Sequence, residues 1–134
     1  MREYVAMSQF TVVTTAAPPF DYEMEALRGM DVKFVTVAAE QLAEAAGTAD
    51  ALYPTAKVTR AVIEAAAARC RVIALGSIGA DYVDVLAATE HGIPVTNVPD
   101  TFVEEVADHT MALLLGAFRR LVEHDRLVRD GRWR

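Results

Sequence analysis

Five short runs of apolar, largely β-branched residues alternate with helix-like patterns along the first hundred residues of this chain. The runs lie at 10–15, 32–37, 51–53, 72–75 and 94–96, and the helical patterns between them lie at 22–28, 39–46, 59–69 and 83–91. Alternation at this spacing predicts parallel strands joined by right-handed crossover helices. We therefore expect an α/β fold with a doubly wound parallel sheet of five strands.

The composition limits the class of protein. A chain of 134 residues with 53% hydrophobic and 24% charged residues suits a globular domain with a real core. The formal net charge of −6 argues against a nucleic-acid partner, which would require a basic face. No apolar run approaches the roughly 20 residues that span a bilayer, and residues 1–9 lack the apolar run of a signal peptide. We expect a cytoplasmic protein that binds neither nucleic acid nor membrane.

Residues for metal binding or nucleophilic catalysis are not apparent. Cys70 is the single cysteine, so it has no second thiol for a disulfide or a metal site, and we expect it to be buried at the start of a strand. The histidines lack the sequence context of a catalytic triad. Glu105 and His109 lie one helical turn apart, but two groups do not make a metal site. We predict no catalytic and no metal-binding residue.

Segments rich in turn residues follow four of the expected strands, at 16–19, 53–54, 76–79 and 97–100. The carboxyl ends of parallel strands share one edge of the sheet, and ligands of open α/β sheets bind there. Tyr53 and the loop Gly76–Gly79 are therefore candidates for a binding site.

Gly76-Ser77-Ile78-Gly79 is the most suggestive of these loops. Its two glycines allow a turn with outward-facing amides, and Asp81 or Asp84 can cap the helix that follows. Such amides beside a helix N-terminus suit an anion. The alternative is a tight turn that serves only the helix. The spacing is not Gly-x-Gly-x-x-Gly, so the dinucleotide-binding motif is absent.

A long helix is expected after residue 100. Thr101 and Glu104 match a capping box, and the pattern continues without a break to about Asp130, before Gly131. Its centre is apolar all round, because successive residues step by about 100° and Leu113–Leu115 therefore point three ways. We expect residues 101–130 to form the core of a homodimer.

Four segments of the chain resemble the D-isomer-specific 2-hydroxyacid dehydrogenases, the family of phosphoglycerate dehydrogenase, glyoxylate reductase and the C-terminal binding proteins. They are residues 72–84, 91–100, 103–115 and 129–133. The resemblance implies a flavodoxin-like substrate-binding domain over residues 1–100, and a crossover and dimerisation helix with a linker over 101–134. In the family a domain that binds NAD or NADP follows such a segment. We expect that domain to be absent here, and no cofactor to bind to this chain alone.

The resemblance also implies site residues. In the family, the loop similar to Ile78-Gly79 holds the substrate carboxylate through backbone amides, and Ser77 could add a hydroxyl donor. Phe102 and Val106 match positions that face the nicotinamide. The expected substrate-binding residues are thus Ser77, Ile78, Gly79 and Tyr53, and the expected cofactor-binding residues are Phe102 and Val106.

These observations predict the substrate-binding domain of an NAD(P)-dependent D-2-hydroxyacid dehydrogenase that is inactive alone. Its ligand would be a small 2-hydroxy or 2-oxo acid, which the sequence does not identify further. The catalytic Arg, Glu and His of the family have no counterpart among these residues. Two alternatives are a non-enzymatic interaction module and a free-standing small-carboxylate-binding domain.

Overall fold

The computed structural model describes residues 9–132, which fall into two compact units divided between Pro99 and Asp100. The first unit is built on a sheet of five strands. These are β1 (Phe10–Thr14), β2 (Val32–Thr36), β3 (Ala51–Tyr53), β4 (Ile73–Ala74) and β5 (Val95–Thr96). All pairs are parallel, and the strand order is β2-β1-β3-β4-β5. The predicted five-stranded parallel sheet is confirmed, with several strands a little shorter than expected.

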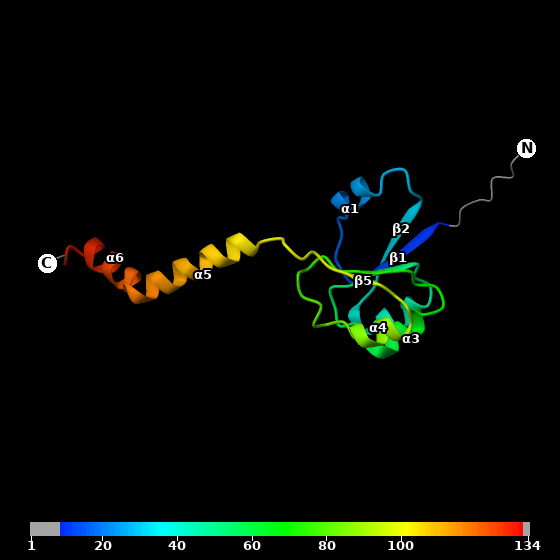
Figure 1. The fold of residues 1–134 in the computed structure, drawn as a ribbon. Coiled ribbons are helices and arrows are strands. Elements are labelled where there is room, and N and C mark those ends of the chain that lie inside the picture. Colours follow the sequence, from blue (N-terminus) through cyan, green and yellow to red (C-terminus); the bar gives the residue numbers. More distant parts are fainter. Residues whose placement is uncertain (1–8, 133–134) are drawn as a thin grey trace, which may run out of the picture. The chain divides into compact units, whose positions relative to one another are not determined.

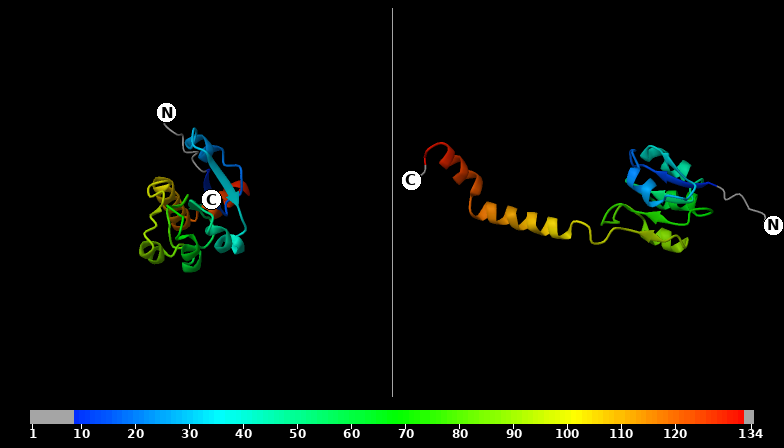
Figure 2. Two further views of the ribbon diagram at one scale, coloured as in Figure 1. Left: turned by 90° about the vertical axis from the view of Figure 1, so that its right-hand side faces the viewer. Right: turned by 90° about the horizontal axis from the view of Figure 1, so that it is seen from above.

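The helices of the first unit lie in the segments between the strands. They are α1 (Asp21–Ala26), the 3-10 helix η1 (Ala39–Gln41), α2 (Leu42–Ala46), α3 (Arg60–Ala66) and α4 (Val85–Glu90). Figure 1 shows α3 and α4 on one side of the sheet and α1 on the other, and the two views of Figure 2 agree. This is the doubly wound arrangement that the alternation predicts.

The hydrophobic core lies between the sheet and the helices α2, α3 and α4. Leu52 and Ile73 are paired in register on β3 and β4, and both are fully buried. They belong to one cluster with Val13 of β1, Leu42 of α2 and Ile63 of α3. Because adjacent strands and the helices above them contribute to the same cluster, burial of these side chains fixes the register of the central strands.

The opposite face of the sheet is covered only by α1 among the described residues. Phe20, just before α1, stacks on Phe34 of β2 with ring centroids 4.7 Å apart. Beside it lies an apolar groove of about 760 Å³, whose lining includes Phe10, Val12, Val32, Phe34, Ala51 and Ala74. The same groove reaches Tyr53 and Gly76 at the carboxyl ends of β3 and β4.

The second unit consists of two helices, α5 (Val103–Phe118) and α6 (Leu121–Arg129). The expected unbroken helix to Asp130 is therefore wrong. Arg120 adopts a left-handed backbone conformation with φ of 50°, which ends α5. Its guanidinium donates two hydrogen bonds of 2.7 Å to the Glu123 carboxylate, and this ion pair holds the turn between the helices.

The expected capping box at the start of α5 is also wrong. Phe102, and not Thr101, immediately precedes the helix, and it has a φ of 67° and no side-chain cap. An N-cap residue normally has extended backbone angles, so the left-handed Phe102 moves the Thr101 hydroxyl out of the capping position. At the other end, Gly131 has a φ of 67° just after α6, which confirms the expected helix end. No helix between residues 9 and 132 is long and apolar enough to cross a membrane.

The packing predicts a contrast between two leucines. Leu52→Ala should lower the free energy of unfolding by about 2–5 kcal/mol, because it leaves a cavity in the core. Leu86 on α4 is 66% exposed, so Leu86→Ala should change that free energy by less than about 0.5 kcal/mol. Urea unfolding followed through the backbone NMR signals of β1 and β3 measures both. Equal effects of the two substitutions would contradict this core.

Candidate amide cradle at the carboxyl edge of the sheet

The loops after β1 and β3 are tied together where the strand order reverses. The Thr14 hydroxyl donates a hydrogen bond of 2.6 Å to the Tyr53 carbonyl. The Thr15 hydroxyl accepts from the amides of Thr55 and Ala56, at 2.8 and 3.1 Å. In open α/β sheets, this reversal point is where ligands bind. Because all strands are parallel, the four predicted exits do share one edge.

Three consecutive carbonyls in the loop after β4 are held by hydrogen bonds. The Ser77 carbonyl accepts from the Val98 amide at 3.1 Å, and the Ile78 carbonyl accepts from Asn97 Nδ2 at 2.8 Å. The Gly79 carbonyl accepts from Ser77 Oγ at 2.9 Å. By contrast, the amides of residues 76–80 donate to no acceptor within residues 9–132. A row of free amides at an exposed edge suits an anion.

The Ser77 hydroxyl supports this loop from within. Its oxygen lies 2.9 Å from the Gly79 carbonyl and 3.0 Å from the Tyr82 hydroxyl. A carbonyl only accepts, so the single Ser77 hydrogen is directed to Gly79, and Tyr82 donates to Ser77. Tyr82 also lies 3.5 Å from the Pro54 carbonyl, in the loop after β3. In this arrangement Tyr82 supports Ser77 while lying next to the loop after β3, and the Ser77 hydrogen is used within its own loop.

Tyr53 ends β3 beside the same loop. Its hydroxyl donates to Glu23 Oε1 on α1 at 3.2 Å. Partial burial raises the pKa of Tyr53, and the Glu23 carboxylate raises it further, so the phenol is protonated at neutral pH. A Cβ at Gly76 would lie 2.8 Å from the Tyr53 hydroxyl oxygen. Gly76 is thus required for the close approach of the phenol to the loop.

The loop is not the N-terminal end of a helix, in contrast to the expectation for Gly79. Helix α4 begins only at Val85, after residues 80–84 have continued the loop. Asp84 Oδ1 accepts from the Ala87 amide at 2.9 Å, which confirms Asp84 as the N-cap. A positive helix end therefore contributes nothing to the amides of Ile78 and Gly79, whose affinity for an anion rests on their own dipoles.

The two residues expected to face a nicotinamide lie in the second unit. Phe102 precedes α5 and Val106 lies within it, and both side chains are exposed, by 64% and 61%. Their cofactor contact remains a prediction.

The described residues do not fit a dinucleotide. The turn between β1 and α1 contains Pro18 and Pro19, which have no amide hydrogen for a pyrophosphate. None of the seven glycines forms a Gly-x-Gly-x-x-Gly motif. Within residues 9–132, no group of three or more His, Cys, Asp or Glu side chains could hold a metal ion. Cys70 is buried, as expected, and burial raises the pKa of its thiol.

Three residues of this site were not singled out by the sequence. Tyr82 and Asn97 contact the loop Gly76–Gly79, and Glu23 of α1 accepts a hydrogen bond from Tyr53 beside it. Asn97 lay in a recognised turn segment, and its position after a strand was the available signal. The partners of Glu23 and Tyr82 depend on tertiary packing alone.

Comparison with known proteins places this site in a family. Residues 11–124 match the family described as D-isomer specific 2-hydroxyacid dehydrogenase, catalytic domain. The chain belongs to this family. It is 40% identical over 97 residues to a glyoxylate reductase of Pyrococcus furiosus, covering 71% of this chain and 29% of that protein. It is 38% identical over 96 residues to D-3-phosphoglycerate dehydrogenase 2, chloroplastic, of Arabidopsis thaliana, covering 70% of this chain and 15% of that protein.

Solved structures share the fold of this chain. The PH0520 protein from Pyrococcus horikoshii OT3 superimposes with a TM-score of 0.75 at 32% identity, over 92% of this chain and 38% of that one. A D-lactate dehydrogenase from Aquifex aeolicus, complexed with NAD and lactic acid, superimposes with a TM-score of 0.71 at 24% identity, over 92% of this chain and 38% of that one. At this identity, the likeness supports the shared fold and nothing more. The chain spans 29% of the Pyrococcus furiosus relative and 21% of a Korarchaeum cryptofilum glyoxylate reductase.

The Tyr53–Glu23 contact predicts a pH effect. A raised pKa in the folded state means that the proton stabilises the fold fully below the unfolded value of about 10. This contribution is lost as the pH rises through the folded pKa of Tyr53. Glu23→Gln should lower the Tyr53 pKa towards its ordinary value. This pKa is measured from the absorbance of tyrosinate during a pH titration, and the signal of Tyr53 is obtained by subtracting the titration of the same protein with Tyr53→Phe. Glu25→Gln on the same helix is the control, since Glu25 pairs with Arg28. An equal shift in both variants would contradict the contact.

Proposed function

We propose that the first unit is the substrate-binding domain of an NAD(P)-dependent D-2-hydroxyacid dehydrogenase. We propose further that the free amides of Ile78 and Gly79, called the amide cradle below, bind the carboxylate of a small 2-oxo or 2-hydroxy acid. The observation that carries this proposal is the row of free amides in the loop after β4, with its carbonyls held on the other side. The names of the glyoxylate reductases that the chain resembles support an acid of this class.

The reaction that we propose for the assembled enzyme is hydride transfer between a nicotinamide and the carbinol carbon of the acid. The bound nicotinamide would supply the hydride chemistry. The role of this unit is to bind and orient the carboxylate through the amides of Ile78 and Gly79. Because its residues fit neither a dinucleotide nor an acid/base triad, we propose that it is inactive alone. The alternative roles, an interaction module or a free carboxylate-binding domain, and the cytoplasmic location remain predictions from the sequence.

The cradle predicts weak but specific anion binding. Two hydrogen bonds to a carboxylate contribute about 3–6 kcal/mol before the cost of association is subtracted, so the dissociation constant for glyoxylate should be on the order of 1 mM or higher. In a titration of the 15N-labelled chain with glyoxylate, the amide signals of Ile78 and Gly79 should shift together and saturate. Gly79→Val should weaken binding by at least about tenfold, because the side chain screens the amides.

The matched control for this substitution is Gly47→Val. Gly47 is exposed at the end of α2, and a Cβ there meets only an ordinary contact of 3.4 Å with the Ala65 carbonyl. Gly79 likewise has no left-handed φ, and its Cβ would meet the mobile end of Asp81 at 3.0 Å, so both variants should fold. Saturable binding that leaves Ile78 and Gly79 unshifted would rule out the cradle.

We further propose that residues 101–130 form a homodimer interface. None of the residues of α5 is buried in the single chain. Leu113, Leu114 and Leu115 point in three directions and are 62%, 47% and 55% exposed. A helix that is apolar all round is normally covered on all sides. A second copy of the same helix provides such a cover with closed two-fold symmetry.

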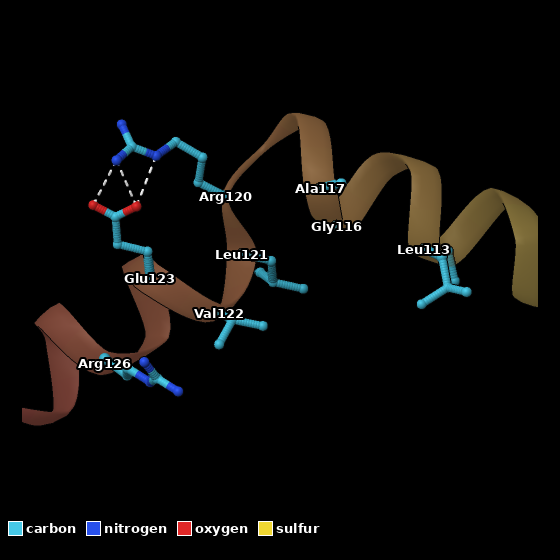
Figure 3. Close-up of a pocket in the computed structure, with 9 residues that line it drawn as sticks. Leu113, Gly116, Ala117, Arg120, Leu121, Val122, Glu123 and Arg126 are labelled. Carbon is cyan, nitrogen blue, oxygen red and sulfur yellow. Dashed lines mark hydrogen bonds and ion pairs between the residues drawn. The ribbon is translucent and has the colours of Figure 1, made fainter.

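The bend between α5 and α6 forms a groove in which that second copy could pack. A groove of about 650 Å³ lies along its inner side, with an apolar lining that includes Ala112, Leu113, Ala117, Leu121 and Val122. Figure 3 shows Leu113 and Leu121 on the inner side of the bend, while Arg120 and Glu123 form their ion pair on the other side. Arg120, Glu123 and Arg126 also line this groove, so a partner helix would pack on its apolar groups with charged groups beside them.

The dimer predicts the effect of a double truncation. Leu114 and Phe118 are 47% and 77% exposed on α5. Each copy carries both residues, so Leu114→Ala with Phe118→Ala removes four side chains from the dimer interface. At about 1 kcal/mol per side chain, the dimer dissociation constant rises roughly a thousandfold. Sedimentation equilibrium should show a dimer for the wild type and a monomer for the double variant. Val85→Ala with Leu86→Ala, on exposed positions of α4, is the control and should remain dimeric. A wild-type monomer at tens of micromolar, on the order of the concentrations used in such runs, would refute the interface.

A further inference from the structure

The orientation of the cradle amides follows from the hydrogen bonds on the neighbouring carbonyls. A trans peptide unit is planar, with its C=O and the N–H of the next residue pointing in opposite directions. The Ile78 carbonyl is drawn towards Asn97 Nδ2 at 2.8 Å, so the Gly79 N–H points away from Asn97. The Ser77 carbonyl is drawn towards the Val98 amide at 3.1 Å, so the Ile78 N–H points away from Val98.

Both of these donors come from the segment that leaves β5. The register pairs Ile73 with Val95 and Ala74 with Thr96, and the Leu75 amide continues the ladder to the Thr96 carbonyl at 2.8 Å. Asn97 and Val98 therefore lie beside the loop Gly76–Gly79 because of strand pairing. One of the two peptide units is held by a backbone donor, and the other is held by a side chain, that of Asn97.

We propose that Asn97 is a positioning residue, which holds the Ile78–Gly79 peptide so that the Gly79 amide faces the substrate carboxylate. This inference rests on the proposed function of the cradle. An asparagine suits the role because its Nδ2 can donate a hydrogen bond to the Ile78 carbonyl. Aspartate has nearly the same shape, but it has no hydrogen to donate, and its negative charge would oppose a carboxylate.

The experiment compares the wild type with Asn97→Ala and Asn97→Asp in the same glyoxylate titration of the full chain. Asn97→Ala should weaken binding about tenfold, or about 1.4 kcal/mol at 25 °C, and Asn97→Asp by at least as much. The Gly79 amide shift at saturation should shrink in both variants, whereas the Ile78 shift should be retained, because the Val98 amide still holds that peptide. A role limited to folding would not separate two adjacent amides.

Thr48→Ala is the matched control, because it removes another exposed side-chain hydrogen bond to a carbonyl, that of Thr48 Oγ1 to Ala45 at 2.8 Å. It should leave glyoxylate binding unchanged. The midpoint of urea unfolding identifies any variant that fails to fold. If one of the two Asn97 variants does not fold, the glyoxylate titration of the other one tests the proposal. Wild-type affinity with an unchanged Gly79 shift in a folded Asn97 variant overturns this inference alone. A wild type whose Gly79 amide does not respond to glyoxylate overturns the proposed function and this inference together.

Discussion

The parallel pairing of β3, β4 and β5 brings every part of the candidate site together. Parallel strands end at the same edge, so the loops after Tyr53, Ala74 and Thr96 become neighbours although they are far apart in the sequence. The pairing is short, with only two residues in β4 and in β5, and it is secured by fully buried side chains such as Leu52 and Ile73. A one-residue slip would turn these side chains to the opposite face. The contacts of Asn97 with Ile78 and of Ser77 with Tyr82 therefore depend on core packing several residues away.

In the proposed function, the amides of Ile78 and Gly79 would bind an anion through backbone dipoles. Glu23 is hydrogen-bonded to Tyr53, and Asp81 lies beside Gly79. Lys57 and Arg60 line a small groove with Asp81, and Arg60 is already paired with Glu90 at 2.6 Å. Amide dipoles facing water bind a carboxylate weakly, and they gain strength when water is excluded from them. High affinity at this edge therefore calls for a second surface, and a cation carried by that surface would add to the amide hydrogen bonds.

The sequence was sufficient for the parts of the fold that depend on local patterns. Apolar β-branched runs located all five strands, and Asp84 and Gly131 marked helix ends through their own backbone chemistry. The break at Arg120 was missed because every residue around it fits a continuous helix. It depends on a left-handed φ and on the Arg120–Glu123 ion pair, for which the sequence offers no distinct sign. The start of α5 was predicted wrongly because the sequence offers no distinct sign of the left-handed backbone at Phe102 either.

The candidate site was likewise predicted only where it depends on local sequence. The loop Gly76–Gly79 was recognisable, because glycines after a buried strand permit exposed amides. The residues that orient those amides were not, since Asn97 and Ile78 are brought together only by strand register. Tyr82 and Pro54 likewise meet across two loops. Sequence patterns thus identify where the backbone is free to bind, whereas the direction of each peptide is set by partners from other strands.

The break at Arg120 also changes what the apolar helix can do in an assembly. An unbroken helix from residue 101 to 130 would be roughly 45 Å long, whereas the 16 residues of α5 span about 24 Å. The apolar residues are concentrated in α5, while α6 carries Glu123, Asp125, Arg126 and Arg129 among its nine residues. In the proposed dimer, a shorter apolar helix followed by a charged helix would concentrate the hydrophobic contact on α5 and on the inner side of the bend. The ion pairs of α6, such as Arg129 with Asp125 at 2.9 Å, can then remain in water, where pairing costs no desolvation.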